Sequence, residues 1–313
     1  MKAVIPFVTQ LADDGTAWLH ALRAVMPEHN LSPLEELTAE QCAAAEVAIV
    51  VNPDPADLAD LPNLKWVQSL WAGVEGLLAD TRDANFAIVR MTDPQLAETM
   101  AEAVLAWTFY LHRDMPRYRK QQLDRIWRQH PLPLPHQRTV GLLGLGNMGK
   151  AAAKRLLQQG FKVCGWSRSQ IDIEGVETVS GADGLPQVLQ RSNILVCLLP
   201  LTNQTHGLLN HDTLGLLPNG ASLINFARGP IVDTQALITH LNSGRLSHAV
   251  LDVFDQEPLS PQSPLWSHPN ITILPHISAP TNKQTAAAIA AKNINRYLSK
   301  GEIPPSVDRT RGY

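Results

Sequence analysis

The sequence has few cysteines, almost no net charge and no long apolar run. Cys42, Cys164 and Cys197 are an odd number without the spacing of a metal site, and the last two lie within apolar runs. We therefore expect buried, reduced thiols and no metal centre. A net charge of −3 provides no basic surface for nucleic acid or anionic lipid. The apolar stretch 3–8 is too short for a signal peptide or a membrane span. We expect a cytoplasmic protein whose partners include neither nucleic acid nor membrane.

What the chain does contain is a regular alternation of short apolar runs with longer helical patterns. Its 313 residues, 44% hydrophobic and 18% charged, are typical of a globular protein with two domains. The alternation favours the α/β class with parallel sheets. Apolar runs predict strands at 2–8, 46–51, 64–70, 85–90, 139–144, 161–166, 193–199, 222–227, 248–254 and 271–276.

Helices are predicted between these runs. The clearest is 96–115, rich in Ala, Leu and Met and without interior Gly or Pro, and 17–26 is another. A helix over 234–244 ends at a glycine, and an Ala-rich helix covers 281–301. The last residues, 304–313, have little apolar content and predict an extended tail.

One glycine-rich turn carries the first functional signal. The segment from Gly144 to Gly149 fits G-x-G-x-x-G, with an apolar strand before it and a good helix former after it. Gly149 permits close packing of helix on strand, and Gly146 lets the backbone approach a pyrophosphate. This context predicts dinucleotide binding rather than an ordinary tight turn. The predicted cofactor contacts here are Gly144, Gly146, Asn147, Met148 and Gly149.

The acid that binds a ribose 2′-hydroxyl is missing. About 20 residues after such a turn an acidic residue is expected, but Ser167, Arg168 and Ser169 stand there, and Asp172 lies beyond the strand. An Arg pairs with a 2′-phosphate, and Ser hydroxyls add donors. We predict that the chain prefers NADPH, with NADH as a possible alternative. The competing interpretation is that Arg168 is a solvated loop residue.

Three later segments each end an apolar strand with a polar or charged side chain. They place Arg228, Asp252 with Glu257, and His276 at strand ends. The carboxyl ends of parallel strands face the crevice in which ligands bind. Each residue also has a structural interpretation. Arg228 would neutralise a helix end, Glu257 would be a turn residue, and a lone His is more often structural than catalytic.

The order of these motifs resembles a known family. G-x-G-x-x-G, then N-x-A-R-G, D-V-F-x-x-E-P-L and P-H-I-S-A resemble the D-isomer-specific 2-hydroxyacid dehydrogenases over nearly the whole chain. WVQSLWAGVEGL and the Ser-Arg-Ser segment most resemble the NADPH-preferring bacterial glyoxylate/hydroxypyruvate reductases. The resemblance implies reduction of a small 2-oxo acid, such as glyoxylate or hydroxypyruvate, to the D-2-hydroxy acid.

The resemblance also implies roles for the strand-end residues. Arg228, Glu257 and His276 correspond to the catalytic triad: His276 donates a proton, Glu257 hydrogen-bonds its ring and favours the protonated form, and Arg228 holds the substrate carboxylate and carbonyl. Hydride comes from the nicotinamide, and the fixed geometry supplies much of the rate. Asp252 and Ser278 are implied to contact the nicotinamide end of the cofactor.

A loop near the start of the chain is implied to bind substrate. Ala72 and Gly73 would offer backbone N–H groups to the substrate carboxylate, because small residues let an anion approach. Trp71 would form a wall of the pocket and favour acids of two or three carbons. Without the resemblance, a plain strand-to-helix turn is an equally good interpretation.

The family fold implies two doubly wound parallel-sheet domains. A flavodoxin-like substrate domain, 1–99 and 280–313, would contain an inserted Rossmann-type cofactor domain, 100–279, and the cleft between them would close over the ligands. Similar enzymes are homodimers, so segments 103–111 and 125–135 are candidates for an interface. A buried helix explains the first segment equally well.

Other functions share this architecture, because fold alone does not fix function. A corepressor-like protein that senses dinucleotides is one, and the triad does not exclude it. A dehydrogenase for a larger 2-oxo acid and an oxidising enzyme of the phosphoglycerate type are two others. We favour the reductase because Ser-Arg-Ser favours NADPH, and because the sequence shows neither long disordered extensions nor an appended regulatory domain.

Overall fold

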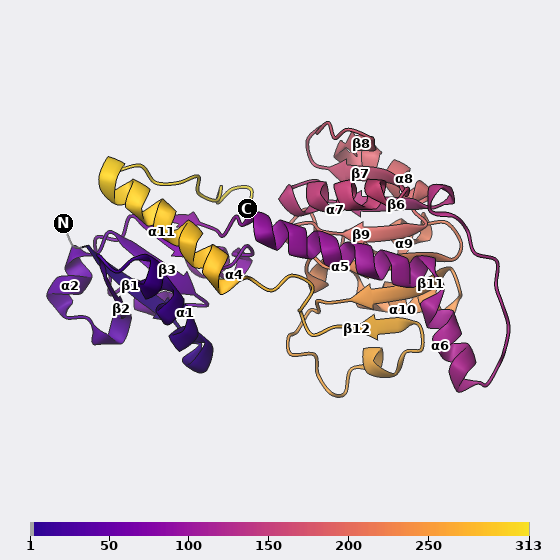
Figure 1. Cartoon of the computed structure of the whole chain (residues 1–313), viewed down its shortest axis with the longest axis horizontal. Helices are drawn as coiled ribbons and strands as arrows, with labels where there is room; N and C mark the ends of the chain where they lie inside the picture. Colours follow the sequence, from indigo (N-terminus) through magenta and orange to yellow (C-terminus); the bar gives the residue numbers. More distant parts are fainter. Residues whose placement is uncertain (1–2, 313) are drawn as a thin grey trace. The chain divides into compact units, whose positions relative to one another are not determined.

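A computed structural model describes residues 3–312 and divides the chain into two compact units. Unit 1 contains the residues up to Gln95 and those from Thr281 onward, and unit 2 contains Leu96–Pro280. Unit 2 is therefore inserted into unit 1 along the sequence, with the divisions at 95/96 and 280/281 where the sequence suggested 99/100 and 279/280. Each unit is a parallel sheet with helices on both faces, which confirms the predicted α/β class (Figure 1).

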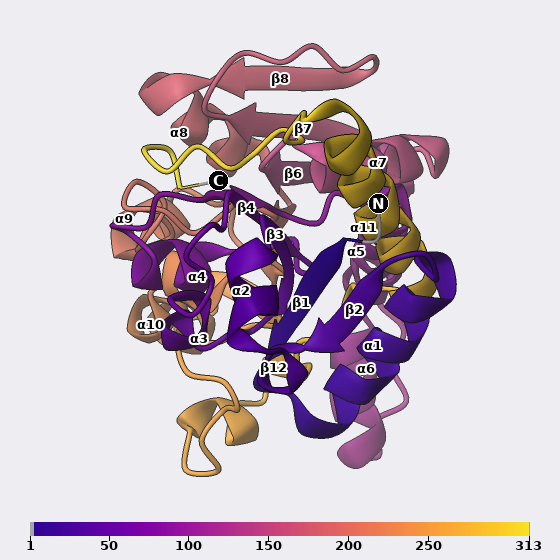
Figure 2. The same cartoon turned by 90° about the vertical axis from the view of Figure 1, so that its left-hand side faces the viewer.

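Unit 1 has a five-stranded sheet in the order β2-β1-β3-β4-β5, the order of flavodoxin-like domains. One apolar core lies between the sheet and helices α1 and α11, and another lies under α2, α3 and α4 (Figure 2). The elements are β1 Val4–Thr9, α1 Ala12–Val25, β2 Asn30–Pro33, α2 Ala39–Ala44, β3 Val47–Val51, α3 Pro55–Leu58, β4 Trp66–Ser69, α4 Glu75–Asp80, β5 Ala87–Val89 and α11 Lys283–Lys300.

Unit 2 has a seven-stranded sheet in the order β12-β11-β10-β9-β6-β7-β8. Helices α5 and α7 cover one face, and α8, α9 and α10 cover the other. The elements are α5 Pro94–His112, α6 Met115–Leu123, β6 Thr139–Leu143, α7 Asn147–Gln158, β7 Lys162–Ser167, β8 Val176–Ser180, α8 Gly181–Arg191, β9 Ile194–Cys197, α9 His211–Gly215, β10 Ala221–Asn225, α10 Thr234–Asn242, β11 Leu246–Leu251 and β12 Ile271–Ile273.

The order of strands reverses once in each sheet. In unit 1 the reversal lies between β1 and β3, and in unit 2 it lies between β6 and β9. In open parallel sheets, ligands bind beyond the carboxyl ends of the strands at such a reversal. The glycine turn follows β6 and therefore lies at this point of unit 2.

Two strands were absent from the prediction, and both are short edge strands. β2 pairs only with β1 and contains the polar sequence NLSP, and β8 pairs only with β7 and reads VETVS. An edge strand has one neighbour and more solvent contact, so its sequence needs fewer apolar residues. An apolar-run criterion therefore misses it.

The predicted ends of two helices were wrong. α1 begins at Ala12 rather than at residue 17, so Gly15 lies inside the helix, where a Cβ would lie 3.0 Å from a Thr9 methyl carbon. The long helix predicted over 96–115 ends at His112. Asp114 adopts φ +54, which turns the chain into the separate helix α6. Positive φ interrupts a right-handed helix.

The C-terminal segment is held against unit 1, although an extended tail was predicted. Val307 is buried and its N–H donates to the Ile88 carbonyl over 2.8 Å. The Arg309 guanidinium donates to the carbonyls of Thr81 (2.7 Å) and Phe86 (2.9 Å). Polar contacts hold much of this segment against unit 1. The prediction relied on apolar content, which is low here, and so did not anticipate these contacts.

Two of the cysteines are buried and free, as predicted. Cys164 is in β7 and Cys197 is in β9, and burial raises the pKa of the Cys197 thiol to about 12. Such a thiol stays protonated near neutral pH, so it behaves as a small apolar side chain. Within residues 3–312, no helix combines the length and apolarity that a membrane crossing needs.

Candidate active site

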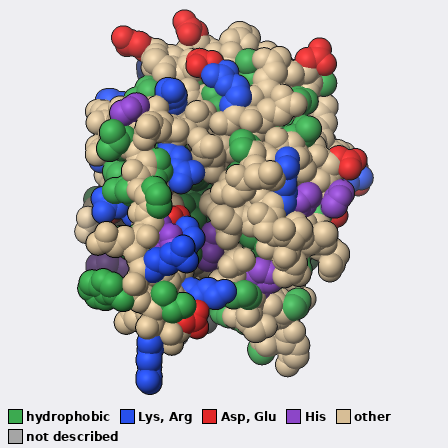
Figure 3. Space-filling view, turned by 90° about the vertical axis from the view of Figure 1, so that its right-hand side faces the viewer, with side chains coloured by type: hydrophobic (Ala, Val, Ile, Leu, Met, Phe, Trp, Pro, Cys, Tyr) green, Lys and Arg blue, Asp and Glu red, His purple; other side chains and the backbone are tan. Residues whose placement is uncertain are grey.

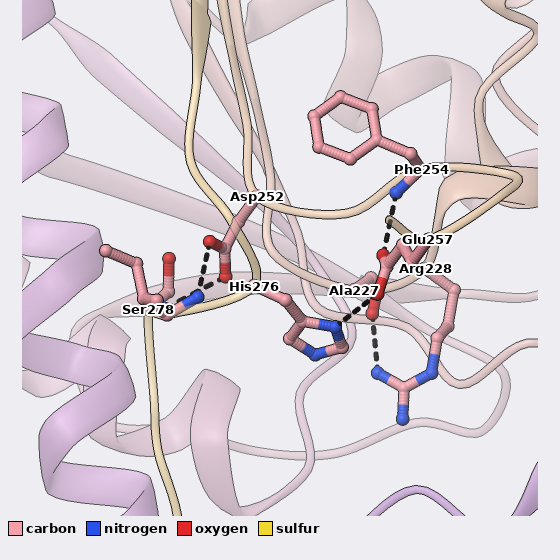
Figure 4. A network of polar contacts seen from close by, with 8 residues as sticks. Ala227, Arg228, Asp252, Phe254, Glu257, His276 and Ser278 are labelled. Atoms are coloured by element: carbon pink, nitrogen blue, oxygen red, sulfur yellow. Dashed lines mark hydrogen bonds and ion pairs between the residues drawn. The ribbon is translucent and has the colours of Figure 1, made fainter. Parts of the chain in front are cut away.

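The loops that follow β10, β11 and β12 bring the predicted triad residues of unit 2 together (Figure 4). His276 Nδ1 lies 2.7 Å from Oε2 of Glu257. The other Glu257 oxygen, Oε1, accepts the backbone N–H of Phe254 over 2.9 Å. Both carboxylate oxygens are therefore engaged, which fixes the carboxylate against the ring. The side chains of His276 and Glu257 are 53% and 36% exposed, respectively.

Asp252 holds the turn that carries His276. Its carboxylate is 2% exposed and accepts the N–H groups of Ile277 (2.7 Å) and Ser278 (2.9 Å), while its carbonyl accepts the N–H of His276 (3.0 Å). His276 has φ +54, a conformation that costs a non-glycine residue about 1–2 kcal/mol. Three hydrogen bonds from one residue stabilise this strained turn. Sequence reasoning assigned Asp252 to the cofactor and did not foresee these bonds.

Arg228 is set by the turn after β10. The Asn225 amide donates to the Arg228 carbonyl (3.1 Å) and accepts the N–H of Ala227 (3.2 Å), and Asn225 is 1% exposed. A Cβ on Gly229 would lie 2.0 Å from the carbonyl carbon of Phe254, so only glycine fits between these two loops. Figure 4 draws the Arg228 guanidinium together with the His276 imidazole. Nη1 of Arg228 donates to the Ala227 carbonyl over 2.6 Å.

The sequence prediction missed the part that Asn225 plays. It is the last residue of β10, a polar residue that closes a buried apolar strand. Asp252 directly follows the last residue of β11, Leu251. The signal was therefore present: a buried strand that ends in Asn or Asp supplies a side chain that organises the following loop.

The glycine turn has the shape that a dinucleotide needs. Gly144 has φ +100, and a Cβ there would lie 2.7 Å from the Leu198 carbonyl oxygen. A Cβ on Gly149 would lie 2.0 Å from the Gly144 carbonyl oxygen, so helix α7 packs directly on the turn. By contrast, a Cβ on Gly146 meets nothing within 4 Å. Gly146 borders open space at the start of α7, where no side chain caps the helix. A pyrophosphate fits there.

Within the turn, Asn147 is exposed and Met148 is half-buried at the first positions of α7. The Ser167–Ser169 segment begins at the last residue of β7. The Ser167 hydroxyl is buried and donates to the Ser169 carbonyl over 2.7 Å, so it shapes the turn. The side chains of Arg168 and Ser169 are exposed.

Ser278 supplies a second observation that fits a bound cofactor. Its side chain is 7% exposed, and within residues 3–312 its hydroxyl oxygen has no hydrogen-bond partner. A buried hydroxyl without a partner is costly, and such groups often meet a ligand. With the open space at Gly146, the residues of unit 2 fit a nicotinamide dinucleotide.

The predicted substrate loop belongs to unit 1. Trp71, Ala72 and Gly73 follow β4, are half-buried and form an irregular bend before α4. The Trp71 indole N–H donates to Oδ1 of Asn52 over 2.9 Å. Asn52 was not among the predicted site residues. The approach of this loop to the unit 2 residues stays a prediction.

Comparisons with known proteins agree with these features. Residues 105–278 match the NAD-binding domain of the D-isomer-specific 2-hydroxyacid dehydrogenases. The chain is 36% identical to a glyoxylate/hydroxypyruvate reductase A of Yersinia enterocolitica over 309 residues, 96% of this chain and 97% of that protein.

Solved structures give the same result. A D-isomer-specific 2-hydroxyacid dehydrogenase of Xanthobacter autotrophicus, crystallised with NADPH and MES, has a TM-score of 0.93 and 36% identity over the full length of both chains. An NADPH-dependent glyoxylate/hydroxypyruvate reductase of Sinorhizobium meliloti, crystallised with NADP and sulfate, has a TM-score of 0.91 and 32% identity, also over both full chains. The protein belongs to the D-isomer-specific 2-hydroxyacid dehydrogenase family and is an NAD(P)-dependent oxidoreductase.

Proposed function

We propose that this enzyme uses NADPH to reduce a small 2-oxo acid, such as glyoxylate or hydroxypyruvate, to the D-2-hydroxy acid. The observation that carries the proposal is the 2.7 Å contact between His276 Nδ1 and Glu257, at the sheet edge that also bears Arg228. This is an arrangement for moving a proton next to a bound anion. The curated relative from Yersinia enterocolitica bears the name of this activity.

The reaction assigns one task to each side chain. Because Nδ1 of His276 faces Glu257, Nε2 is the nitrogen that donates a proton to the developing alkoxide. Glu257 holds the ring in this orientation through its contact with Nδ1. Arg228 presents its guanidinium to the carboxylate and the keto oxygen. The nicotinamide, when bound, supplies the hydride.

The proposed preference for NADPH depends on the residues after β7. Arg168 and Ser169 are exposed where an acid that favours NADH would stand. An exposed guanidinium pairs with a 2′-phosphate, which an acidic residue would repel. The relatives from Xanthobacter autotrophicus and Sinorhizobium meliloti were crystallised with NADPH and NADP, respectively, which supports the proposal. NADH would then be the weaker cofactor.

The substrate loop and the cofactor residues complete the proposed site. Backbone N–H groups of Ala72 and Gly73 would bind the substrate carboxylate, and Trp71 would form a wall beside it. Ser278, whose hydroxyl is buried, would meet the carboxamide end of the cofactor, and Asp252 would hold the turn on which Ser278 stands.

We also propose that the chain is a homodimer. Segment 125–135 and helix α6 expose several large apolar side chains: Leu123 (71%), Ile126 (51%), Trp127 (98%), Leu132 (49%) and Leu134 (54%). Apolar and basic side chains are interspersed on the face that Figure 3 shows. A monomer seldom leaves so much apolar surface in water. Light scattering of Trp127→Ser should show a smaller mass than the parent if this surface joins two copies, and Trp266→Ser, an exposed tryptophan elsewhere, is the matched control.

The test of the function is turnover. NADPH oxidation should be rapid with glyoxylate and hydroxypyruvate and much slower with acetaldehyde, which lacks the carboxylate that Arg228 and the loop would bind. Product analysis with hydroxypyruvate should give D-glycerate. Binding of NADPH without turnover of any 2-oxo acid would contradict the proposal and favour a dinucleotide-sensing protein, whereas turnover only with larger acids would favour a different dehydrogenase.

A further inference from the structure

The indole of Trp71 is tied across the carboxyl edge of the unit 1 sheet. Trp71 follows β4, but its Nε1 donates to Oδ1 of Asn52, which follows β3, over 2.9 Å. Its ring also meets the ring of Trp18 in α1 at 5.8 Å between centroids and an interplanar angle of 83°. The indole therefore extends from the end of β4 past the end of β3 to α1.

Hydrogen bonds hold both the backbone of Trp71 and its aromatic neighbour, Trp18. The Trp71 carbonyl accepts the N–H of Met91 over 2.9 Å, and its N–H donates to the Ser69 hydroxyl over 3.1 Å. Trp18 is 1% exposed, and its indole N–H donates to Asp14 over 3.1 Å. Rotating the Trp71 ring away would break the bond to Asn52 and the contact with Trp18.

Asn52 stands at the reversal of strand order in this sheet. It has φ +43, a left-handed conformation that Asn tolerates better than most residues, and its carbonyl accepts the N–H of Gln10 at the end of β1 over 3.3 Å. Its side chain is exposed, so the bond to Trp71 satisfies no buried group. The bond therefore lies at the edge of the sheet at which ligands bind in such folds.

We infer that Asn52 fixes Trp71 as a specificity-determining wall for the substituent on the keto carbon of the substrate. This inference rests on the proposed function, in which the amides of Ala72 and Gly73 bind the substrate carboxylate. Trp71 directly precedes them, so a rigid indole plate lies beside the bound acid. The plate accommodates the hydrogen of glyoxylate or the hydroxymethyl group of hydroxypyruvate and clashes with a longer chain. Trp71 is the wall, and Asn52 is its positioning residue.

The experiment compares kcat/KM for 2-oxopentanoate with kcat/KM for glyoxylate, both with NADPH. Trp71→Ala should raise this ratio about tenfold or more, because a single methylene is worth about 10–200-fold in an apolar pocket. Asn52→Gly keeps the left-handed backbone and removes the amide, and Trp71→Phe keeps a ring and removes the donor. Each of these two variants should raise the ratio severalfold, because the ring at position 71 is no longer held by the hydrogen bond to residue 52. Asn52→Asp retains an acceptor oxygen and should therefore keep the parent ratio.

Two further variants distinguish positioning from general damage. Asn52→Gly combined with Trp71→Phe should raise the ratio no more than the stronger single change, because both remove the same bond. Trp266→Phe removes an exposed indole hydrogen bond (to the Ser260 carbonyl, 2.9 Å) from unit 2 and should leave the ratio unchanged. An unchanged ratio in Asn52→Gly, or additive effects in the double variant, overturns the inference while the activity of the parent upholds the proposed function. A parent that reduces no 2-oxo acid overturns both.

Discussion

The carboxyl edges of the two sheets differ in the kind of group that they present. In unit 2 the edge carries ionisable side chains, and Glu257 and Asp252 hold His276 and its turn by hydrogen bonds. In unit 1 the edge carries backbone amides, the amide of Asn52 and the indole of Trp71. The first set suits proton transfer, and the second suits recognition by shape. We expect changes in unit 2 to alter kcat and changes at the edge of unit 1 to alter selectivity.

The largest expected effect tests this contrast directly. His276→Ala removes the proton donor and should lower kcat about 10²–10⁴-fold, the usual contribution of general acid catalysis. The KM for NADPH should change little, because His276 serves the keto oxygen. Steady-state kinetics with glyoxylate measure both quantities. His136→Ala, an exposed histidine of unit 2, is the control. A variant that keeps a tenth of the parent kcat would contradict the assignment and break the contrast.

A second effect follows from the buried histidine of β11. Desolvation lowers the pKa of His248 to about 4, and its Nε2 lies 2.8 Å from the Thr272 hydroxyl. The unfolded chain binds a proton near pH 6.5 and the folded one does not, so the free energy of unfolding falls as pH drops from about 6.5 toward 4. A difference of about 2.5 pKa units corresponds to about 3 kcal/mol over this window.

His248→Gln should flatten that dependence, because Gln does not titrate. Urea unfolding of parent and variant at pH 7.5 and pH 4.5 measures it. The pKa of His112, in α5, is also lowered, mainly by desolvation, so both groups place acid sensitivity in unit 2. Equal losses in parent and variant between the two pH values would show that His248 is not responsible.

The contrast also explains how far the sequence could lead. In unit 2 the predictions used ionisable residues, whose chemistry follows from the residue type alone. Arg228, Glu257 and His276 each follow an apolar run, and the structure brings their loops together because parallel strands end at one edge (Figure 4). The parallel α/β class followed from the same runs. Periodicity locates such strands because they are buried on both faces.

The rest depended on which segments the fold brings together, because a local pattern can mark a residue such as Asp252 but not its partners. The left-handed turn at His276 exists because Asp252 hydrogen-bonds three backbone groups, which requires β11 and β12 to be neighbours. The pairing of Asn52 with Trp71 joins residues that follow two different strands. The hydrogen bond from Arg309 to the Thr81 carbonyl comes from a polar segment that shows no pattern of a strand or helix. Tertiary hydrogen bonds of polar side chains leave no periodic signature in the sequence.

A third, smaller effect concerns the cofactor. Arg168→Ala should lower kcat/KM with NADPH about tenfold or more, because a hydrogen bond to a charged group contributes about 1.5–3 kcal/mol, and should change the value with NADH little. The ratio of the two cofactors, measured with glyoxylate, is the readout. Arg119→Ala, an exposed arginine on α6, controls for loss of positive charge. An unchanged ratio would remove Arg168 from the site and leave the cofactor preference to other residues of unit 2.

The smallest effect belongs to unit 1 and concerns stability alone. The Arg309 guanidinium bridges the carbonyls of Thr81 and Phe86 and lies over the Phe86 ring at 5.8 Å. Arg309→Ala should lower the free energy of unfolding by about 1 kcal/mol, because solvent partly replaces these bonds. Arg311→Ala, which removes only an exposed ion pair with Asp308, should change it less. Since kcat depends on side chains of unit 2, it should stay at the parent value in both variants. A fall in kcat in Arg309→Ala without a change in stability would mean that unit 1 takes part in the chemical step, and the division of labour between the two edges would have to be abandoned.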